Sequence, residues 1–346
     1  MREFLSEHAL AALVGIGGGL LLGLAARLGR FCTLGAIEDL SYAGDGNRAR
    51  MWLVAMGAAI LGTSLLAWAG WFEPARSIYI TGWNPIAAVL GGLMFGYGMA
   101  LAGNCGYGAL ARFGGGDLRS FVIVLVMGLA AYATISGPLA ALRVAAFPPI
   151  LPEAGSLADM ASRLTGLDAA LLGTICGALV LGAAILAGSI ASRGAILWGC
   201  VVAAAIVSAW AGTAWIARTG FEDLPVVSHT FAAPLGETML YTMTSSGNRV
   251  SFGIGSVMGV LAGAFIGSLI KGHFRWEACE DPRELTRQIG GAALMGVGAV
   301  LALGCSIGQG LSAMSVLAPS APIVAICIYL GARLGLRQLI EGFRTV

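Results

Sequence analysis

Long apolar runs without a charged residue constrain the fold of this sequence more than any other feature. Runs of about 20 such residues are long enough to cross a lipid bilayer as a helix. Hydrophobic residues make up 58% of the 346 positions and charged residues only 11%, whereas a soluble domain carries about a quarter. We therefore predict an all-α polytopic membrane protein.

The uncharged runs predict nine transmembrane helices. Seven runs accommodate one span each, and the run 288–332 accommodates two, near 288–304 and 320–340. The seven single runs are 9–26, 51–72, 77–111, 120–142, 169–192, 194–217 and 250–270. The run 77–111 is too long for one helix, so surplus chain is expected near residue 105 as well as near residue 305.

The distribution of positive charge predicts the orientation. If the N-terminus lies outside, the inside-facing segments hold 14 Lys and Arg residues and the outside-facing segments hold 6. Cytoplasmic loops carry the excess of such residues, so we predict an outside N-terminus and a cytoplasmic C-terminus.

The chain contains an internal repeat. GGLMFGYGMALAGNCGYG (91–108) aligns with GAALMGVGAVLALGCSIG (291–308) at an offset of 200, and GNR recurs at 46–48 and 247–249. The third span thus corresponds to the eighth, and a shift of five spans reverses direction across the bilayer. We predict a first inverted repeat over 1–142 (spans 1–4), a loop and connector span over 143–192, and a second repeat over 193–346 (spans 6–9). Inverted repeats are typical of transporters.

The same pattern occurs a third time at 18–35, which aligns with 91–108 at an offset of 73. Three glycine-flanked cysteines, Cys32, Cys105 and Cys305, therefore each follow a predicted spanning helix. A fourth such element is expected within 218–240, where the sequence has no cysteine.

The breaks at the cysteines favour a small anion. The segments after Cys105 and Cys305 predict short re-entrant helices, and each cysteine would lie near a helix N-terminus, whose free N–H groups and dipole attract negative charge. A thiol is a weak donor with a soft, polarizable sulfur, which suits an anion that carries sulfur at one end. Weak contacts also allow release at each step.

The three cysteines are the main candidates for substrate relay and binding. A second group of candidates surrounds them and consists of Gly35, Asn104, Gly106, Tyr107, Gly108, Gly304, Ser306, Gly308 and Gln309. Of these, Asn104 and Gln309 are expected to cap the short helices. Cys176, Cys200 and Cys327 lie inside unbroken apolar spans and are interpreted as packing residues, and Cys279 as a loop cysteine.

Several classes of site are not expected. The seven cysteines form no CxxC pair, so free thiols are predicted. The three histidines are scattered, which gives no support to a metal site, and no sequence feature indicates a cofactor or an ATP-binding loop. A formal net charge of +2 without a basic tract argues against nucleic acid as a partner.

The motifs RFCTLGAIEDL, GLMFGYGMALAGNCGYGALAR and GVGAVLALGCSIGQGLS, with PLGETMLY and GNR, resemble the YeeE/YedE family of bacterial inner-membrane proteins. The resemblance implies a nine-span bundle with hollows on both faces. It further implies passage of thiosulfate past Cys105, Cys305 and Cys32 by transient S–H···S hydrogen bonds. Membrane lipid and a small sulfur-carrier protein of the TusA type are the partners it implies, and some relatives are associated with selenium.

Three functions remain open from the sequence. The first is a thiosulfate permease without covalent chemistry. The second is an intramembrane sulfurtransferase that forms a cysteine persulfide, which needs an activated thiolate. The third is a transporter of another sulfur or selenium species or small anion, for which the cysteines would be incidental.

Overall fold

The described part of the chain is helical and contains no strand. The structure, a computed structural model, describes residues 6–80, 82–148, 155–186, 193–222, 224–278 and 281–342. Within these residues, eight helices are long and apolar enough to cross a membrane. The protein is therefore an all-α, multi-pass membrane protein, as the apolar runs predict.

The spanning helices follow one another along the chain with short helices between them. The candidate spans are α1 (Glu7–Arg27), α3 (Asn47–Trp68), α4 (Pro85–Ala102) continued by α5 (Gly106–Phe113), α6 (Leu118–Ile135), α9 (Ala169–Leu186), α10 (Arg193–Thr219), α12 (Phe252–Ile270) and α14 (Ser320–Glu341). A ninth long helix, α13 (Pro282–Leu301), is equally long but begins with charged residues. The short elements are α2 (Thr33–Glu38), η1 (Asp39–Ala43), η2 (Pro74–Arg76), α7 (Ala140–Ala146), α8 (Leu157–Thr165), α11 (Ala233–Thr244) and η4 (Gly308–Ala313).

Two predicted span boundaries are wrong. The span expected over 120–142 ends at Ile135, and α7 follows as a separate short helix. The break contains Gly137 and Pro138, and proline can neither donate the helical hydrogen bond nor fit against the preceding turn. The span expected over 51–72 lies at 47–68, because its polar first turn is helical too. Residues 187–192, at the end of the fifth predicted span, lie outside the described residues.

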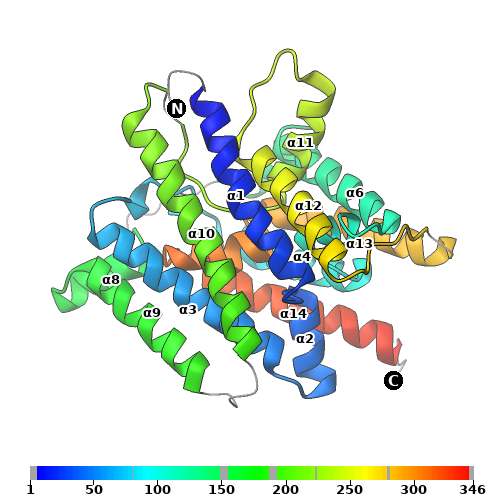
Figure 1. Cartoon of the computed structure of the whole chain (residues 1–346), viewed down its shortest axis with the longest axis horizontal. Helices are drawn as coiled ribbons and strands as arrows, with labels where there is room; N and C mark the ends of the chain where they lie inside the picture. Colours follow the sequence, from blue (N-terminus) through cyan, green and yellow to red (C-terminus); the bar gives the residue numbers. More distant parts are fainter. Residues whose placement is uncertain are drawn as a thin grey trace.

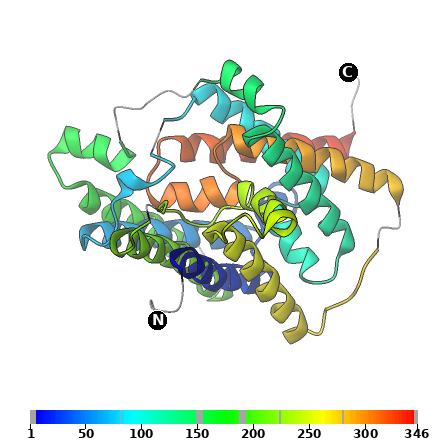
Figure 2. The ribbon, with the colours of Figure 1, turned by 90° about the horizontal axis from the view of Figure 1, so that it is seen from above.

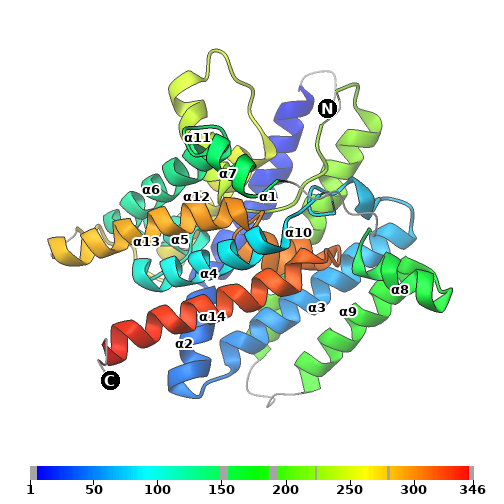
Figure 3. The ribbon, with the colours of Figure 1, turned by 180° about the vertical axis from the view of Figure 1, so that it is seen from behind.

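The long helices form two neighbouring groups. In Figure 1, α1, α10 and α12 run close together through the middle of the molecule, and α9 lies against α3. Figure 3 shows α4 between α13 and α14 on the other side of the molecule. We call the face where α1 begins the N-face and the face where α14 ends the C-face. They lie toward the top and the bottom of Figure 1, and Figure 2 looks down on the N-face.

Helix contacts occur in pairs that match the repeat. Under the offset of 200, α3 corresponds to α12, α4 to α13 and α6 to α14, and by order along the chain α1 corresponds to α10. The contact of α1 with α12 then has its counterpart in α10 with α3, and that of α4 with α14 in α13 with α6. Since α4 and α13 correspond to each other, exchanging the two repeats leaves their contact unchanged. This contact therefore joins the two repeats. The repeat boundaries themselves stay a prediction.

Repeated glycines allow α4 and α13 to cross closely. A Cβ atom at Gly98 would lie 2.5 Å from the Gly291 carbonyl oxygen, and one at Gly291 would lie 2.6 Å from the Gly98 oxygen. The same exchange links Gly91 with Gly298, at 2.6 and 2.7 Å. Small residues let backbones approach in this way, which explains why these positions recur in both repeats.

We predict that Gly291→Ala destabilises the protein and that its neighbour Gly290→Ala does not. A Cβ at Gly291 meets the backbone of α4, whereas a Cβ at Gly290 meets nothing within 4 Å. Overpacking of this kind costs about 1–3 kcal/mol, so the unfolding midpoint in detergent should fall for Gly291→Ala only. Equal midpoints for the two variants would contradict the close crossing of α4 and α13.

Candidate functional site

The three cysteine motifs share one backbone conformation. The residue two positions before each cysteine lies in the left-handed region, with φ of 57° at Arg30, 77° at Gly103 and 57° at Leu303. This conformation ends a helix sharply and costs a non-glycine residue about 1–2 kcal/mol. Its recurrence at Arg30 and Leu303 therefore indicates that the surrounding structure enforces the turn.

Each thiol caps the short helix that follows it. The backbone N–H groups of Gly35, Gly108 and Gly308 donate to the sulfur atoms of Cys32, Cys105 and Cys305, over 3.5, 3.4 and 3.4 Å. The positions expected for the cysteines, at the N-termini of short helices, are thus confirmed. Each sulfur therefore lies beside backbone N–H groups at the start of a short helix.

The motifs of the two repeats meet at Ser306. Its hydroxyl accepts a hydrogen bond from Thr33 Oγ1 over 3.0 Å. The same hydroxyl is also hydrogen-bonded to the Cys105 thiol. Cys105 is close enough to both Cys32 and Cys305 to interact electrostatically with each. The structure therefore brings together three cysteines that are separated by up to 273 positions in the sequence.

The fourth repeated element completes the surroundings of Cys305. The Phe231 N–H donates to the Cys305 sulfur over 3.3 Å, and Thr230 Oγ1 lies 3.7 Å from it. The Thr230 hydroxyl also hydrogen-bonds with Tyr79. At the offset of 200, Phe231 corresponds to Phe31 and Ala232 to Cys32, so alanine occupies the fourth cysteine position.

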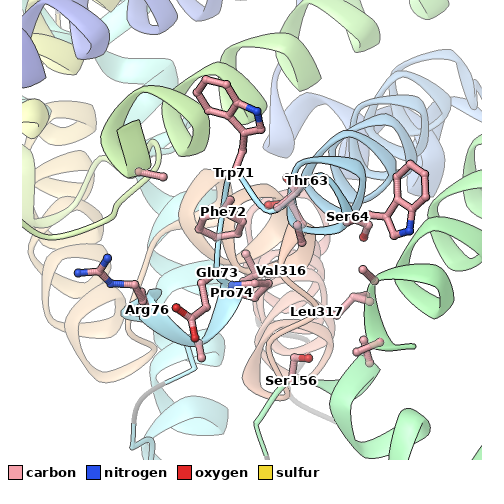
Figure 4. A pocket seen from close by; sticks show the side chains of 18 of the residues that line it. Thr63, Ser64, Trp71, Phe72, Glu73, Pro74, Arg76, Ser156, Val316 and Leu317 are labelled. Carbon is pink, nitrogen blue, oxygen red and sulfur yellow. The ribbon is translucent and has the colours of Figure 1, made fainter. Parts of the chain in front are cut away.

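Cavities approach this cluster from both faces. On the N-face, a cavity of about 670 Å³ lies between the end of α3, the segment 69–76, α8 and residues 315–317 (Figure 4). A second N-face cavity of about 240 Å³ reaches Thr230, the neighbour of Cys305. On the C-face, a cavity of about 340 Å³ contains Cys32 and Asn104.

The middle of this arrangement is closed. Cys105 and Cys305 are buried, and neither lines any of these three cavities. Phe31 and Phe231, at equivalent repeat positions, both lie against the Tyr107 ring, with centroids 6.5 and 5.4 Å away. The structure therefore encloses Cys105 and Cys305 between the N-face and C-face cavities, whereas Cys32 lines the C-face cavity.

Comparison with known proteins agrees with this geometry. The model of the family described as sulphur transport matches residues 28–334. This chain belongs to the sulphur transport family. Two similar proteins are the thiosulfate transporters TsuA of Spirochaeta thermophila and of Escherichia coli K12. They are 26% identical over 323 residues (90% of this chain, 94% of the relative) and 27% identical over 310 residues (86% of each chain).

The chain, like its family, is a transporter, and the family match covers all three cysteine motifs. The other cysteines of the described residues lie elsewhere: Cys176, Cys200 and Cys327 are on α9, α10 and α14. Cys279 lies outside the described residues. All six described cysteines are free thiols.

Two expectations about polar neighbours of the thiols need correction. Gln309 does not cap a short helix: its Nε2 donates to the Ala302 carbonyl at the end of α13, over 2.7 Å, and its Oε1 accepts from Ser320. Asn104 is buried but makes no hydrogen bond to any described residue, and its Oδ1 has no partner. Gln309 is thus committed to the fold, whereas the Asn104 amide is left available.

The remaining candidate residues are held by hydrogen bonds or close packing within the fold. Tyr107 donates its hydroxyl to the Leu22 carbonyl over 2.6 Å, which fixes the ring. A Cβ at Gly106 would lie 2.5 Å from Met127 Sδ, and one at Gly308 would lie 2.6 Å from Thr230 Oγ1. A Cβ at Gly304 would approach Gln309 Cγ at 3.3 Å. Close packing explains these glycines, and their direct contact with substrate stays a prediction.

Sequence reasoning missed Thr230, Phe231 and Tyr79. The fourth element is expected between 218 and 240. Applying the offset of 200 to Phe31 without a gap would have placed it at Phe231. Tyr79 lies in a turn between η2 and α4 that carries no repeat signal. These three residues surround Cys305 through contacts between distant parts of the chain.

We predict that Ser306→Ala loosens the contact between the repeats. The Thr33 hydroxyl and the Cys105 thiol lose a common partner, and a buried polar group without a partner costs about 1–3 kcal/mol. The unfolding midpoint should fall and Cys105 should react faster with N-ethylmaleimide, as followed by peptide mass spectrometry. Ser245→Ala, at an exposed helix end, is the control. Unchanged values for Ser306→Ala would contradict the bridge.

Proposed function

We propose that this protein is a thiosulfate permease in which the anion passes Cys305, Cys105 and Cys32. The observation that carries the proposal is the gathering of three thiols, each at a helix N-terminus, between cavities on opposite faces. The names of the two relatives, thiosulfate transporter TsuA, support the choice of substrate.

The chemistry of the turns suits thiosulfate. Its terminal sulfur can accept a weak hydrogen bond from a thiol, and its negative charge is stabilised by the free N–H groups of the short helices. No step requires a covalent bond to the protein. The thiol exchanges one weak contact for another, which keeps each site loose enough to release the anion.

The two repeats support an alternating pathway. We propose that residues 1–142 and 193–346 form the halves, joined by the loop and connector over 143–192. Cys105 belongs to the first half and Cys305 to the second, and the crossing of α4 with α13 lies between them. Small movements of one half against the other would then open the thiols to one face at a time.

The orientation follows from charge. We propose a location in a bacterial inner membrane with the N-face outside and the C-face cytoplasmic. The C-face cavity contains five Lys and Arg side chains and one Glu, which agrees with the positive-inside rule. A small carrier protein of the TusA type is the proposed cytoplasmic acceptor of the imported sulfur.

We predict that Cys32→Ala, Cys105→Ala and Cys305→Ala each lower thiosulfate uptake at least about tenfold, because each removes a contact to a charged substrate worth about 1.5–3 kcal/mol. Uptake is measured in proteoliposomes with radiolabelled thiosulfate. Cys327→Ala is the matched control, because Cys327 is also buried but lies within α14. Full uptake by all three variants would leave the cysteines as packing residues and refute the relay. No uptake by the wild type would refute thiosulfate as substrate.

A further inference from the structure

The two faces differ in the charge around their cavities. The larger N-face cavity is lined by two arginines and three acidic residues, Arg76, Arg218, Glu73, Asp159 and Asp168. The C-face cavity is lined by five cationic side chains, Arg27, Arg30, Arg48, Arg112 and Lys271, and by a single acidic one, Glu38. The C-face cavity therefore has the larger excess of positive charge, which favours an anion.

Three of the five cations are already committed to the fold. Arg27 donates to Ser268 over 2.6 Å, and Lys271 donates to the Arg27 carbonyl over 2.7 Å. Arg48 pairs with Asp39, at 3.1 Å, and its Nη1 occupies the space where a Cβ of Gly35 would lie. These three residues supply positive potential, and each already has at least one polar partner within the fold.

Arg30 and Arg112 are different. Neither side chain makes a hydrogen bond or an ion pair with any described residue, and both line the C-face cavity. A guanidinium presents several N–H groups in a plane that matches two oxygens of a tetrahedral oxyanion. Arg30 is held there in a left-handed conformation two residues before Cys32, which is unfavourable for arginine.

The cavity also contains a group that would recognise the sulfur end of such an anion. Cys32 is half-buried in its wall, so its thiol is the one thiol of the relay that a solute in this cavity reaches. Asn104, which is 2% exposed, also lines the cavity, but its unpartnered atom is Oδ1, an acceptor that cannot bind an anion.

We propose that the C-face cavity is an oxyanion site, in which Arg30 and Arg112 bind the oxygen end of a sulfur oxyanion whose sulfur end lies at the Cys32 thiol. The site rests on the proposed function and extends it, because it assigns recognition of the oxygens to one face. Since the arginines contact only oxygens, sulfate should occupy the site as well, without a sulfur end to pass along the thiols.

The test uses the labelling rate of Cys32 in purified full-length protein in detergent, which needs no transport. An anionic methanethiosulfonate reagent should modify Cys32 about tenfold faster than a cationic one, because two nearby cations favour one reagent and repel the other. Sulfate should slow the anionic reagent, relative to chloride at equal ionic strength. Peptide mass spectrometry measures the modification of Cys32 alone.

Arg30→Gln/Arg112→Gln should bring the two rates close together and abolish protection by sulfate. Arg337→Gln is the control, because Arg337 is exposed and paired with Glu341 near the end of α14. Protection by sulfate in the wild type tests the site even if the double variant fails to fold. No protection, or an unchanged ratio in the double variant, would overturn the site. If the wild type takes up thiosulfate but sulfate does not protect Cys32 from the anionic reagent, only the oxyanion site is rejected. If sulfate protects Cys32 but thiosulfate is not taken up, only the proposed function is rejected.

Discussion

The contact between α4 and α13 is the constraint on which the rest of the pathway depends. A Cβ at Gly91 would meet the Ala302 nitrogen at 2.5 Å, and one at Gly291 would meet the Ala102 nitrogen at 2.7 Å. Ala302 and Ala102 are the residues at which the two helices end, three positions before Cys305 and Cys105. The glycines of each repeat therefore fix the position, along the helix axis, of the cysteine turn in the other repeat. Without this close approach, the two turns could not lie on one path.

In the proposed pathway, helix N-termini and thiols, rather than buried arginines, bind the anion at the turns. A buried arginine would hold a doubly charged anion strongly and would itself be costly in lipid. Helix N-termini supply several partial charges instead, and the thiols add weak contacts through sulfur. In the proposed pathway, the anion leaves the thiols at the C-face cavity, which is lined by five Lys and Arg side chains and one Glu. This separation combines weak binding in the middle with stronger binding at one end.

The sequence was most informative where structure is determined locally. Apolar runs predicted the spans, and the repeated glycines and cysteines predicted the breaks, since both signals depend on residues close in the chain. The end of α6 was missed because Gly137 and Pro138 interrupt a run that stays apolar.

The surroundings of the thiols were less predictable. Thr230, Phe231 and Tyr79 reach Cys305 from two non-helical segments whose paths depend on packing between distant helices. Gln309 looked like a cap for the helix that contains it, yet it bonds to the preceding helix end. The bridge from Thr33 to Ser306 joins the two repeats, and no local pattern announces it.

The most direct test of the account is whether thiosulfate crosses intact. Thiosulfate labelled at the outer sulfur and thiosulfate labelled at the sulfone sulfur should be supplied in parallel to proteoliposomes containing the purified protein. A permease carries both sulfur atoms together, so we expect equal initial rates of uptake and no label retained on Cys32, Cys105 or Cys305. Outer sulfur that stays on a cysteine as a persulfide, while sulfite is released, would contradict the account and identify a sulfurtransferase.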